Sequence, residues 1–594
     1  MSDIDLADVR VTLVETLDEA RDFLHWLGQR RPILAIDTET TGLKWWTPNF
    51  TRLVQFGDGE QAWAIGAREW WQLIHDGMQM IVDSGVPVAM HNAKFDQHAL
   101  ETMGWPIPAW HHVYDTKIMD HLCYPIRSHG LKPMGYRRYG SKAVVGDRML
   151  KAHFDEAKVW WDTVDIRTEA YWAYGGMDTV LTARFAMELG AEMSARGLMP
   201  AFERESAVQA ICYRMEKRGL LIDTEYTVAL REQWAERMVE LRLQLDAWGV
   251  SNPSAKAQVV NALKRKEGWD PEEFTETGEP KLTKGIMGKL DSRIAPLVIE
   301  YKRLEKWTSA YLDHFINEQG NHGAVHPSIN TLAARTGRMS IQNPAMQTLP
   351  SKEATIRRCV LPQDGHRVWA ADYDAMELRV MASFSGDDGL LQMFRDGLDP
   401  HSFTAAMVYG LDYNELLAGE HKAQRGTAKN TVFSRIYGAG SAKIAETAGV
   451  PVQQIDEFQR LYDVRFPGVK RFMDDTQRIA RHRMLHEGEP YVTTPYGRWL
   501  NVEPDGLFRL VNYIIQGSCA DLLKDRLIAL DAAGLSDYVM VPVHDELVCS
   551  IPEGEDEQAI AEEIRATMEE HERFAVPLTC GLEGPGTSWG ALYE

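Results

Sequence analysis

The first 200 residues alternate short apolar runs with amphipathic stretches. Two apolar runs, PILAID (32–37) and VPVAMHNAKFD (86–96), end in polar residues, as strands do when they lead into a site. The segment TEAYWAYGGMDTVLTARFAMELGAEM (168–193) has helical spacing, with two glycines near its middle. This pattern predicts an α/β domain over residues 1–200, with its functional side chains at the strand ends.

Beyond residue 200 the pattern is mostly helical. Residues 203–318 are charged and helical, and REQWAERMVELRLQLDAWG (231–249) is the clearest amphipathic run. The stretch GWDPEEFTETGEPKL (268–282) interrupts them as a predicted loop. Residues 367–387 predict a strand, a polar break and a helix, and helices dominate 386–488.

Strand patterns return in the last hundred residues. EPYVTTPYGRWLNV (489–502) is strand-like, a helix is predicted over 507–531, and DYVMVPVHDELVCSIP (537–552) predicts a β-hairpin turning at His544–Glu546. Two adjacent carboxylates within a buried apolar run are costly unless something compensates them. A turn that exposes them and a metal ion that binds them are both compatible with this pattern.

The composition is that of an ordinary soluble protein with several domains. The chain has 594 residues, 44% hydrophobic and 25% charged, whereas single cores rarely exceed about 300 residues. It has no apolar stretch long enough to span a bilayer and no signal peptide, and its six cysteines form no CxxC pair. We therefore expect a cytoplasmic protein that does not act at a membrane.

The charge is unevenly distributed. Asp and Glu outnumber Lys and Arg by 86 to 64, and the net charge of −22 argues against a nonspecific coat on nucleic acid. Residues 421–443, however, contain basic residues and no Asp or Glu, and a second basic stretch lies around 335–358. Basic segments in an acidic body are typical of a protein that binds a polyanion in one cleft. A solvated helix face is the simpler explanation of either segment alone.

Eight segments of the C-terminal half carry charged and aromatic residues in a recognisable order. Three of them are DYDAMELR (372–379), RGTAKNTVFSRIYG (425–438) and VHDE (543–546). The others are ARTGRMSIQNPAMQTLP (334–350), FPGVKRFM (466–473), TPYGRW (494–499), NYIIQGSCADLLK (512–524) and SWG (588–590). The set resembles family A DNA polymerases, the group of bacterial DNA polymerase I, with the first three as motifs A, B and C. The resemblance implies template-directed addition of deoxynucleotides to a primer 3′ end.

The chemistry of nucleotide addition explains the carboxylates. It is an in-line phosphoryl transfer, which depends mainly on positioning and charge stabilisation. Two magnesium ions can activate the attacking hydroxyl and stabilise the leaving pyrophosphate, and magnesium prefers hard oxygen ligands. Asp372 and Asp545 each end a strand-like run, so we expect them to hold both ions, with manganese as an alternative metal. The resemblance adds the Tyr373 carbonyl as a further ligand and gives Glu546 a supporting catalytic role.

Residues 425–438 also predict a nucleotide-binding face. Four side chains recur every fourth residue along one side of a predicted helix: Arg425, Lys429, Phe433 and Tyr437. By resemblance, Arg425 and the catalytic Lys429 pair with the triphosphate, while Phe433 stacks on the sugar or base. An amphipathic helix with a basic rim explains the same spacing, and the neighbouring motifs favour nucleotide binding.

Other site residues rest on the resemblance alone. Glu377 matches the family residue that excludes ribonucleotides, and Phe433 implies poor acceptance of dideoxynucleotides. The positions that match DNA contacts are Arg338, Gln347, Arg498, Gln516 and His544. The sequence departs from the family pattern at Asp374 and Ala375, at Val432 and Ser434, and at Phe508, where an arginine is expected. These departures bear on minor-groove contacts and fidelity.

The N-terminal half carries a second set of carboxylates in AIDTETTGL (35–43), HNAKFD (91–96) and YGGMD (174–178). Asp37 and Glu39 alternate along a predicted strand, so both side chains can face one ion. The three segments resemble the motifs of DEDD-type 3′–5′ proofreading exonucleases. The resemblance implies a two-metal hydrolytic site with the ligands Asp37, Glu39, Asp96 and Asp178, in which Tyr174 orients the attacking water.

The expected substrate of this second site is a single-stranded DNA 3′ end. By resemblance, Thr38, Leu43 and Asn92 lie near that end. Trp45 and Trp46 could stack on unpaired bases. Aromatic residues in a core or at its rim explain this pair equally well.

These inferences together predict an α/β and α+β multidomain enzyme. A ribonuclease H-like 3′–5′ exonuclease domain (1–200) precedes a right-hand polymerase domain (201–594) with thumb at about 205–330, palm at about 331–405 and 495–594, and fingers at about 406–494. Because the exonuclease motif begins by residue 35, we expect no N-terminal 5′-nuclease domain. The expected partners are primer–template DNA, deoxynucleoside triphosphates and replisome proteins. A phage-type replicative enzyme would meet them in the host bacterial cytoplasm.

Two other functions fit parts of the sequence. In the first, the polymerase half only holds DNA for a nuclease. In the second, the chain is a non-catalytic DNA-binding scaffold. The intact polymerase residues Asp372, Asp545, Lys429 and Tyr437 argue against the first. The six metal-ligand carboxylates of both halves argue against the second, because an inactive protein need not keep them.

Overall fold

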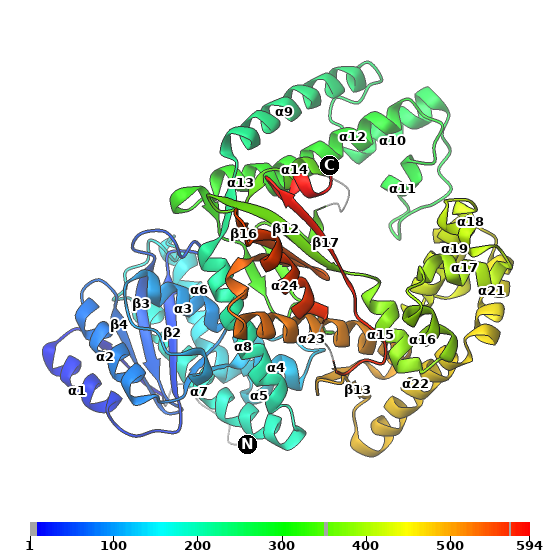
Figure 1. The fold of residues 1–594 in the computed structure, drawn as a ribbon. Helices are drawn as coiled ribbons and strands as arrows, with labels where there is room; N and C mark the ends of the chain where they lie inside the picture. Colours follow the sequence, from blue (N-terminus) through cyan, green and yellow to red (C-terminus); the bar gives the residue numbers. More distant parts are fainter. Residues whose placement is uncertain (1–8, 350–353, 570–571) are drawn as a thin grey trace.

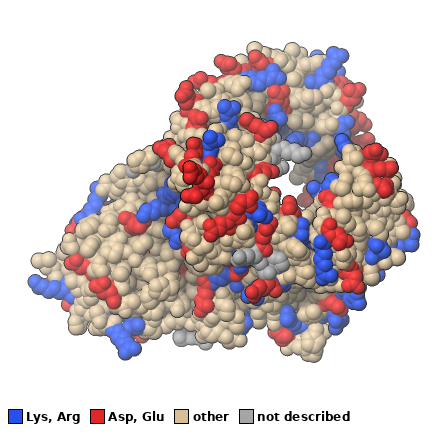
Figure 2. Space-filling model, in the orientation of Figure 1, with Lys and Arg blue, Asp and Glu red and all other residues tan. Residues whose placement is uncertain are grey.

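The computed structural model describes residues 9–349, 354–569 and 572–594. Figure 1 shows the N-terminal part at one side of the molecule and a helical lobe, α16 (Asp388–Arg395) to α22 (Pro467–Glu487), at the other. Strands β12 (His366–Tyr373), β16 (Glu546–Pro552) and β17 (Cys580–Gly586) lie between them. In the space-filling view, the visible face is hollowed beside the helical lobe (Figure 2).

A six-stranded sheet forms the centre of the N-terminal part, with the strand order β1-β4-β3-β2-β5-β6. Strand β2 (Leu34–Thr40) is antiparallel to β3 (Thr51–Gly57) and parallel to β5 (Val88–Met90). The remaining strands are β1 (Arg10–Val14), β4 (Gln61–Gly66) and β6 (Val113–Asp115). The α/β architecture predicted for this part is confirmed, although the predicted strand at 86–96 divides into β5, a turn and helix α3 (Ala93–Thr102).

Helix α7 (Glu169–Arg196) crosses β2, β3 and β4, and it confirms the helix predicted over 168–193. Two glycines permit this close packing. A Cβ at Gly175 would lie 2.4 Å from the side-chain nitrogen of Gln55, and one at Gly176 would lie 2.3 Å from a methyl group of Val11. The other helices around the sheet are α1 (Leu17–Leu27), α2 (Trp71–Ser84), α3, α4 (Thr116–Cys123), α5 (Leu131–Tyr139) and α6 (Val145–Ala157).

The segment that follows is mainly helical, as predicted for 203–318. Its helices are α8 (Met199–Arg218), α9 (Thr224–Asp246), α10 (Lys256–Glu267), α11 (Lys284–Met287), α12 (Ile294–Trp307) and α13 (Asp313–Asn317). Within the predicted loop 268–282, the structure has an isolated bridge between Phe274 and Pro280. Five short strands were not predicted: β7 (Leu220–Ile222), β8 (Ala324–Val325), β9 (Ser328–Asn330), β10 (Ser340–Gln342) and β11 (Val360–Leu361). Strands of two or three residues are too short to give a periodic signal.

A four-stranded sheet with the order β15-β16-β12-β17 forms the centre of the C-terminal half. Strand β12 pairs antiparallel with both β16 and β17, and β15 (Val539–Val543) pairs with β16. The hairpin predicted over 537–552 is confirmed, with Glu546 already in the second strand. The helices packed around this sheet include α14 (Ala354–Arg357), α15 (Met376–Ser385), α23 (Leu510–Ala532) and α24 (Glu557–Glu569).

The helical lobe agrees with the prediction for 386–488. Between α16 and α22 it contains α17 (Pro400–Tyr409), α18 (Tyr413–Leu417), α19 (Lys422–Ile436), α20 (Ser441–Ala448) and α21 (Val452–Arg465). Three aspartates, Asp387, Asp399 and Asp412, cap α16, α17 and α18 through their side chains. Asp387 also accepts a hydrogen bond of 2.8 Å from the Gly468 amide, which joins the start of α16 to α22. The hairpin of β13 (Tyr491–Thr493) and β14 (Trp499–Asn501) follows.

Buried polar contacts join the N-terminal part to the rest of the chain. Glu216 of α8 is 4% exposed and binds Lys94 and His98 of α3. The Lys94 ammonium also donates to the Ile329 carbonyl at 2.5 Å, and Glu216 accepts from the Ile329 amide at 2.5 Å. Because a buried charge without a partner is costly, these contacts fix α3 against α8 and β9.

A second buried ion-pair group lies where α8, β14 and α23 meet. It consists of Glu205, Arg498, Asp521 and Lys524. All six cysteines are buried and free. Among the helices of the described ranges, none combines the length and apolar character needed to cross a membrane.

Candidate active sites

The first carboxylate cluster lies at the end of the central sheet of the C-terminal half. The pairing of β12 with β16 sets Asp372 directly opposite Glu546. His544 adopts a left-handed conformation (φ 58°), and Asp545 follows it in the tight turn between β15 and β16. The Tyr373 amide donates to the Asp545 carbonyl at 3.3 Å. The fold therefore brings the predicted pair Asp372 and Asp545 together, although they are far apart in the sequence.

The electrostatics of this cluster suit a cation. Partial burial and the charges of Asp545 and Glu546 raise the pKa of Asp372 to about 7. Burial also raises the pKa values of Asp545 and Glu546, and Glu546 accepts a hydrogen bond from the Tyr593 hydroxyl. Within the described ranges, neither Asp372 nor Asp545 forms an ion pair with a basic side chain. Hard oxygen donors gathered without a basic partner match the ligand preference of Mg²⁺.

A cavity of about 380 Å³ adjoins these carboxylates. Its walls combine residues of motifs A, B and C with two residues of the segment 334–350: Glu377, Phe433, His544 and Asp545, with Arg338 and Gln347. The His544 imidazole lies 3.0 Å from the Gln347 carbonyl, which places the turn over one wall of the cavity. The cavity is thus lined by predicted nucleotide-binding and DNA-binding residues.

Glu377 is held from two sides of this cavity. The Arg338 guanidinium forms an ion pair with its carboxylate, and the Tyr437 hydroxyl donates to it at 3.1 Å. Tyr437 is the residue that ends α19, so this bond joins α19 to α15. Gln516, on α23, is buried beside Tyr437 and interacts with its hydroxyl.

The basic residues of α19 differ in their surroundings. Lys429 is exposed, and burial together with the Lys429 charge lowers the pKa of His401 to about 4. Arg425 is held by Asp399 at the start of α17, with nitrogen–oxygen distances of 3.0 and 3.1 Å. The Phe433 ring lies 5.6 Å from the His401 ring. The predicted row of side chains therefore shares one helix face that looks toward α17 and the cavity.

Arg498 corrects the sequence analysis. It was predicted to contact DNA, but its side chain is buried, and the residue is only 1% exposed. Its guanidinium forms ion pairs with Glu205 and Asp521. A Cβ at Gly337 (φ 80°) would lie 2.8 Å from the guanidinium, so Arg498 packs under the turn that carries Arg338. This burial argues against the predicted direct DNA contact, because the charge of Arg498 is already neutralised inside the protein.

The second carboxylate cluster lies in the N-terminal part. Asp37 and Glu39 come from β2, Asp96 from the first turn of α3, and Asp178 from the middle of α7. The Thr38 hydroxyl donates to Asp96 at 2.8 Å. Gly175 allows α7 to approach Glu39, whose side-chain oxygen lies 3.0 Å from the position of a Cβ at Gly175. The predicted four carboxylates therefore gather between β2, α3 and α7.

Burial and mutual repulsion raise pKa values within this cluster. Burial raises the pKa of Asp37 to about 6. Burial and the charge of Asp37 raise the pKa values of Glu39 and Asp96 well above their usual range. Burial and the charges of Glu39 and Asp37 also raise the pKa of Tyr174, which places its hydroxyl near both. Divalent cations would relieve this repulsion, so the donor set fits metal ions as the first cluster does.

Lys132 belongs to this cluster and was missed in the sequence. Its ammonium forms an ion pair with Asp178 and lies over the Tyr174 ring, 4.0 Å from the ring centroid. Burial lowers the pKa of Lys132 to about 8, while the charges of Asp37 and Glu39 act in the opposite direction. A single lysine in the segment HGLKPM gives no periodic or spacing signal, so only the fold reveals it.

Most residues expected near a DNA 3′ end, namely Leu43, Trp45, Trp46 and Asn92 but not Thr38, line a cavity of about 540 Å³ between the two halves of the chain. Leu43 is 73% exposed, and Asn92 accepts a hydrogen bond of 3.0 Å from Lys117. Trp45 stacks on His98 with ring centroids 4.1 Å apart, and Trp46 lies 4.9 Å from His326. The two tryptophans are half-buried and packed on protein, so their rings at least partly serve the contact between the halves.

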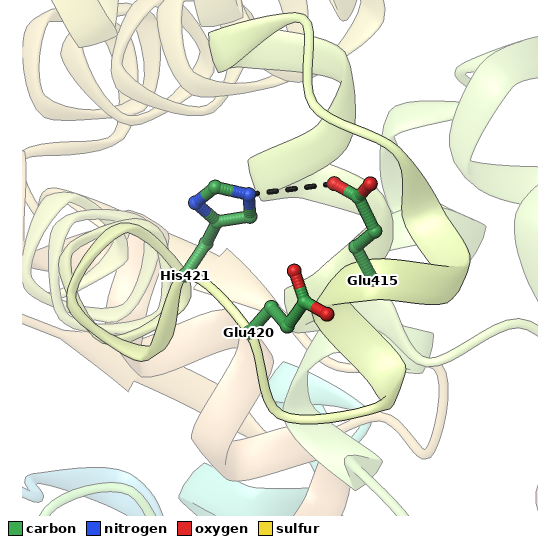
Figure 3. A group of neighbouring side chains, drawn as sticks. All are labelled: Glu415, Glu420 and His421. Atoms are coloured by element: carbon green, nitrogen blue, oxygen red, sulfur yellow. Dashed lines mark ion pairs between the residues drawn. The ribbon is translucent and has the colours of Figure 1, made fainter.

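A third group of potential metal ligands lies in the helical lobe (Figure 3). Glu415 belongs to α18, and Glu420 and His421 lie between α18 and α19, with one ligand atom from each residue within 4.8 Å of the others. Both glutamates are exposed, and Glu415 forms an ion pair with His421 at 3.4 Å. Exposed acidic groups of this kind are common without an ion, so we assign this group no function.

Comparison with known proteins gives consistent matches for both parts. The family model described as "DNA polymerase family A" matches residues 224–591, and the model described as "3'-5' exonuclease" matches residues 11–194. The chain is 31% identical to the DNA polymerase of Mycobacterium phage D29, covering 98% of this chain and 97% of that protein. It is 28% identical to DNA polymerase I of Pseudomonas aeruginosa, covering 96% of this chain and 65% of that protein.

The fold is also similar to that of a solved structure, "POL domain of Pol1 from M. smegmatis complex with DNA primer-template and dNTP". The TM-score is 0.78 and the sequence identity is 21%, with 98% of this chain and 100% of that chain covered. At this identity the likeness bears on the fold alone.

Proposed function

This chain belongs to DNA polymerase family A and carries a 3′–5′ exonuclease domain, and from that premise we propose which residues perform its two reactions. The protein is a DNA-directed DNA polymerase with 3′–5′ exonuclease activity, homologous to mycobacteriophage DNA polymerases. The observation that carries the residue assignments is the β12–β16 pairing, which brings Asp372 and Asp545 to one end of a sheet.

Asp372 and Asp545 hold two Mg²⁺ ions at the polymerase site, with the Tyr373 carbonyl as a further ligand. When bound, the ions supply activation of the primer 3′ hydroxyl and neutralisation of the pyrophosphate charge. The raised pKa of Asp372 and the lack of a basic partner support this assignment. Glu546, bonded to Tyr593, supports the cluster from the neighbouring ladder position.

The incoming deoxynucleoside triphosphate binds between α19 and the carboxylates. The exposed Lys429 pairs with its phosphates, and Arg425 contributes charge from its fixed position beside Asp399. Phe433 contacts the sugar or base, because its ring forms a wall of the cavity. Glu377 sits at the opposite wall and limits the space at the sugar 2′ position.

The primer–template contacts fall on the same cavity wall. Arg338, Gln347 and His544 line the cavity, and Gln516 lies behind Tyr437. We include these four as DNA contacts and leave Arg498 out. Replisome proteins are further partners of this enzyme in the proposal, and the host bacterial cytoplasm is its place of action.

The exonuclease reaction occurs at the N-terminal cluster. Asp37, Glu39, Asp96 and Asp178 hold its metal ions, and Tyr174 orients the attacking water. The closeness of Tyr174 to Asp37 and Glu39, seen in its raised pKa, supports that role. Leu43 and Asn92, at the edge of the large cavity, contact the strand end.

The proposed domains follow the packing of the elements. Residues 1–200 form the exonuclease domain and 201–594 the polymerase domain, with the thumb at about 205–330. We place the boundary between palm and fingers near residue 386 rather than 405. Helices α16 and α17 pack with the fingers helices, as the Asp387–Gly468 and Arg425–Asp399 contacts illustrate.

Primer extension tests these assignments. The purified protein is given a labelled primer–template and Mg²⁺, with and without deoxynucleotides. Wild type should extend with nucleotides and shorten without them. Asp545→Asn should lose extension and keep shortening, and Asp37→Ala with Glu39→Ala should do the reverse. Shortening alone in the wild type would favour a nuclease that only holds DNA, and binding without either activity would favour a scaffold.

A further inference from the structure

Lys132 is a cationic side chain inside the exonuclease cluster. It stands in the first turn of α5, and its ammonium pairs with Asp178 and covers the Tyr174 ring. Asp37 and Glu39 act on the same ammonium electrostatically. Lys132 therefore interacts with three of the four proposed metal ligands and with the residue proposed to orient water.

The helix that carries this side chain is packed in place, while the ammonium at its end is partly exposed. Helix α5 packs on α7, the helix that carries Tyr174 and Asp178, and Met134 of α5 is fully buried. The lysine side chain itself is 21% exposed, so the tip can be reached from solvent. A four-carbon stem can move the ammonium several ångströms without moving the helix.

The charge balance of the site indicates a second binding partner for the Lys132 ammonium besides Asp178. In the described part of the chain, Lys132 is the basic residue that forms an ion pair with any of these four carboxylates. Two divalent cations would balance the four carboxylates and would repel the ammonium from them. The scissile phosphate of a bound strand then offers the nearest uncompensated negative charge. That charge increases in the transition state, where a fixed cation is most effective.

We propose that Lys132 is a catalytic residue of the exonuclease reaction, whose ammonium moves from Asp178 to a non-bridging oxygen of the scissile phosphate. This inference rests on the proposed exonuclease site. In the step, the water oxygen forms a bond to phosphorus and gives up a proton to solvent, and the bond from phosphorus to the 3′ oxygen breaks as that oxygen takes up a proton from solvent. Lys132 exchanges no proton and offsets the added charge on the phosphate oxygens.

Three variants test the proposal in the full-length protein. Lys132→Met removes the charge and keeps the stem, whereas Lys132→Arg keeps the charge. Lys151→Met is the matched control, since Lys151 lies on the neighbouring α6, is paired with Asp147 at 2.9 Å and is 71% exposed. Primer extension and thermal unfolding verify that each variant is folded.

Two measurements separate a phosphate contact from a structural role. The first is single-turnover cleavage of a single-stranded oligonucleotide with Mg²⁺. The second is the salt dependence of binding to that oligonucleotide with Ca²⁺ in place of Mg²⁺. Lys132→Met should cleave about 10²-fold more slowly, as for loss of one charge-stabilising group. Its slope of log K against log salt should fall by about 0.7, the value for one phosphate contact on a single strand. Lys132→Arg should keep the wild-type slope, and Lys151→Met should match the wild type in both measurements.

Each other result overturns the inference. Wild-type cleavage by Lys132→Met would exclude a catalytic role. Slow cleavage with an unchanged salt slope would mean that Lys132 only positions Asp178. A failure of the proposed exonuclease function is distinguishable, because the wild-type protein would then not shorten the oligonucleotide at all.

Discussion

Replacing Glu216 by glutamine should loosen the exonuclease domain without touching either cluster of carboxylates. Glu216 belongs to α8. Its carboxylate binds the side chains of Lys94 and His98 of α3, the helix that carries Asp96. The substitution keeps the shape of the side chain and removes its charge. Lys94, itself 8% exposed, would keep only neutral acceptors, the Ile329 carbonyl and the glutamine oxygen, and would lose its counter-charge.

The magnitude follows from this burial. Removing one partner of a buried ion pair costs about 3–5 kcal/mol, because the remaining charge cannot reach water. At about 1.4 kcal/mol for each factor of ten, opening of α3 becomes about 10²- to 10⁴-fold more frequent. Burial alone would raise the pKa of Glu216, but the charge of Lys94 and the bond from His98 outweigh it and lower the pKa. The stabilisation is therefore present above the ordinary glutamate pKa and is lost as the pH falls through the lowered value.

Hydrogen exchange provides the assay, with a control on the same two helices. Glu101 of α3 accepts from Tyr213 and Lys217 of α8 at 2.7 and 2.8 Å, but the Lys217 side chain is 54% exposed. Glu101→Gln should thus cost at most about 1 kcal/mol. Exchange of the α3 amides should accelerate strongly in Glu216→Gln, exonuclease turnover should fall, and primer extension should persist. If the α3 amides of Glu216→Gln and Glu101→Gln exchange at the same rate at pH 7, the buried contacts of Glu216 do not stabilise α3. The difference in α3 exchange between wild type and Glu216→Gln should shrink as the pH falls through the lowered pKa of Glu216. A difference that persisted in acid would contradict this pH dependence.

Three further predictions concern the polymerase half. At limiting Mg²⁺, primer extension should slow about tenfold for each pH unit below 7, because Asp372 (pKa about 7) must lose its proton to bind a cation. Saturating Mg²⁺ should suppress this dependence, and a flat profile at limiting Mg²⁺ would exclude Asp372 as a ligand. Glu377→Ala should raise ribonucleotide incorporation in competition assays, and an unchanged sugar preference would remove its assigned role. Arg498→Met should destabilise the fold in urea by about 3–5 kcal/mol while leaving the salt slope of DNA binding unchanged; a smaller slope would restore Arg498 as a DNA contact.

The sequence predicted the elements whose pattern is local. The hairpin around His544 and Asp545 alternates apolar strands with a polar turn, and both strands exceed four residues. The helix bearing Tyr174 and Asp178 was predicted over 168–193, and in the structure it spans Glu169–Arg196. The carboxylates of both clusters were predicted because they match ordered motifs.

The sequence did not reveal contacts between residues far apart in the chain. Arg498 was assigned to DNA because an arginine in a motif is indistinguishable from one that pairs with Glu205, almost 300 residues earlier. Lys94 and Glu216 were missed for the same reason, since charged residues on amphipathic helices are normally solvated. Lys132 was missed because its partners come from β2 and α7, and no spacing links it to either.

The neighbours of β12 also set an order of events during synthesis of the protein. Strand β12, which carries Asp372, pairs with residues 546–552 and 580–586, so it gains both neighbours only when these late segments have been made. The nuclease carboxylates, in contrast, all lie within residues 37–178. Long-range strand pairing is slow to form, so a ribosome-bound chain can assemble its degradative centre well before its synthetic one. The buried contacts of Lys94 and Glu216 with Ile329 can form only after residue 329 has emerged. Complete packing of α3, which carries Asp96, therefore requires β9 from the half that will build DNA.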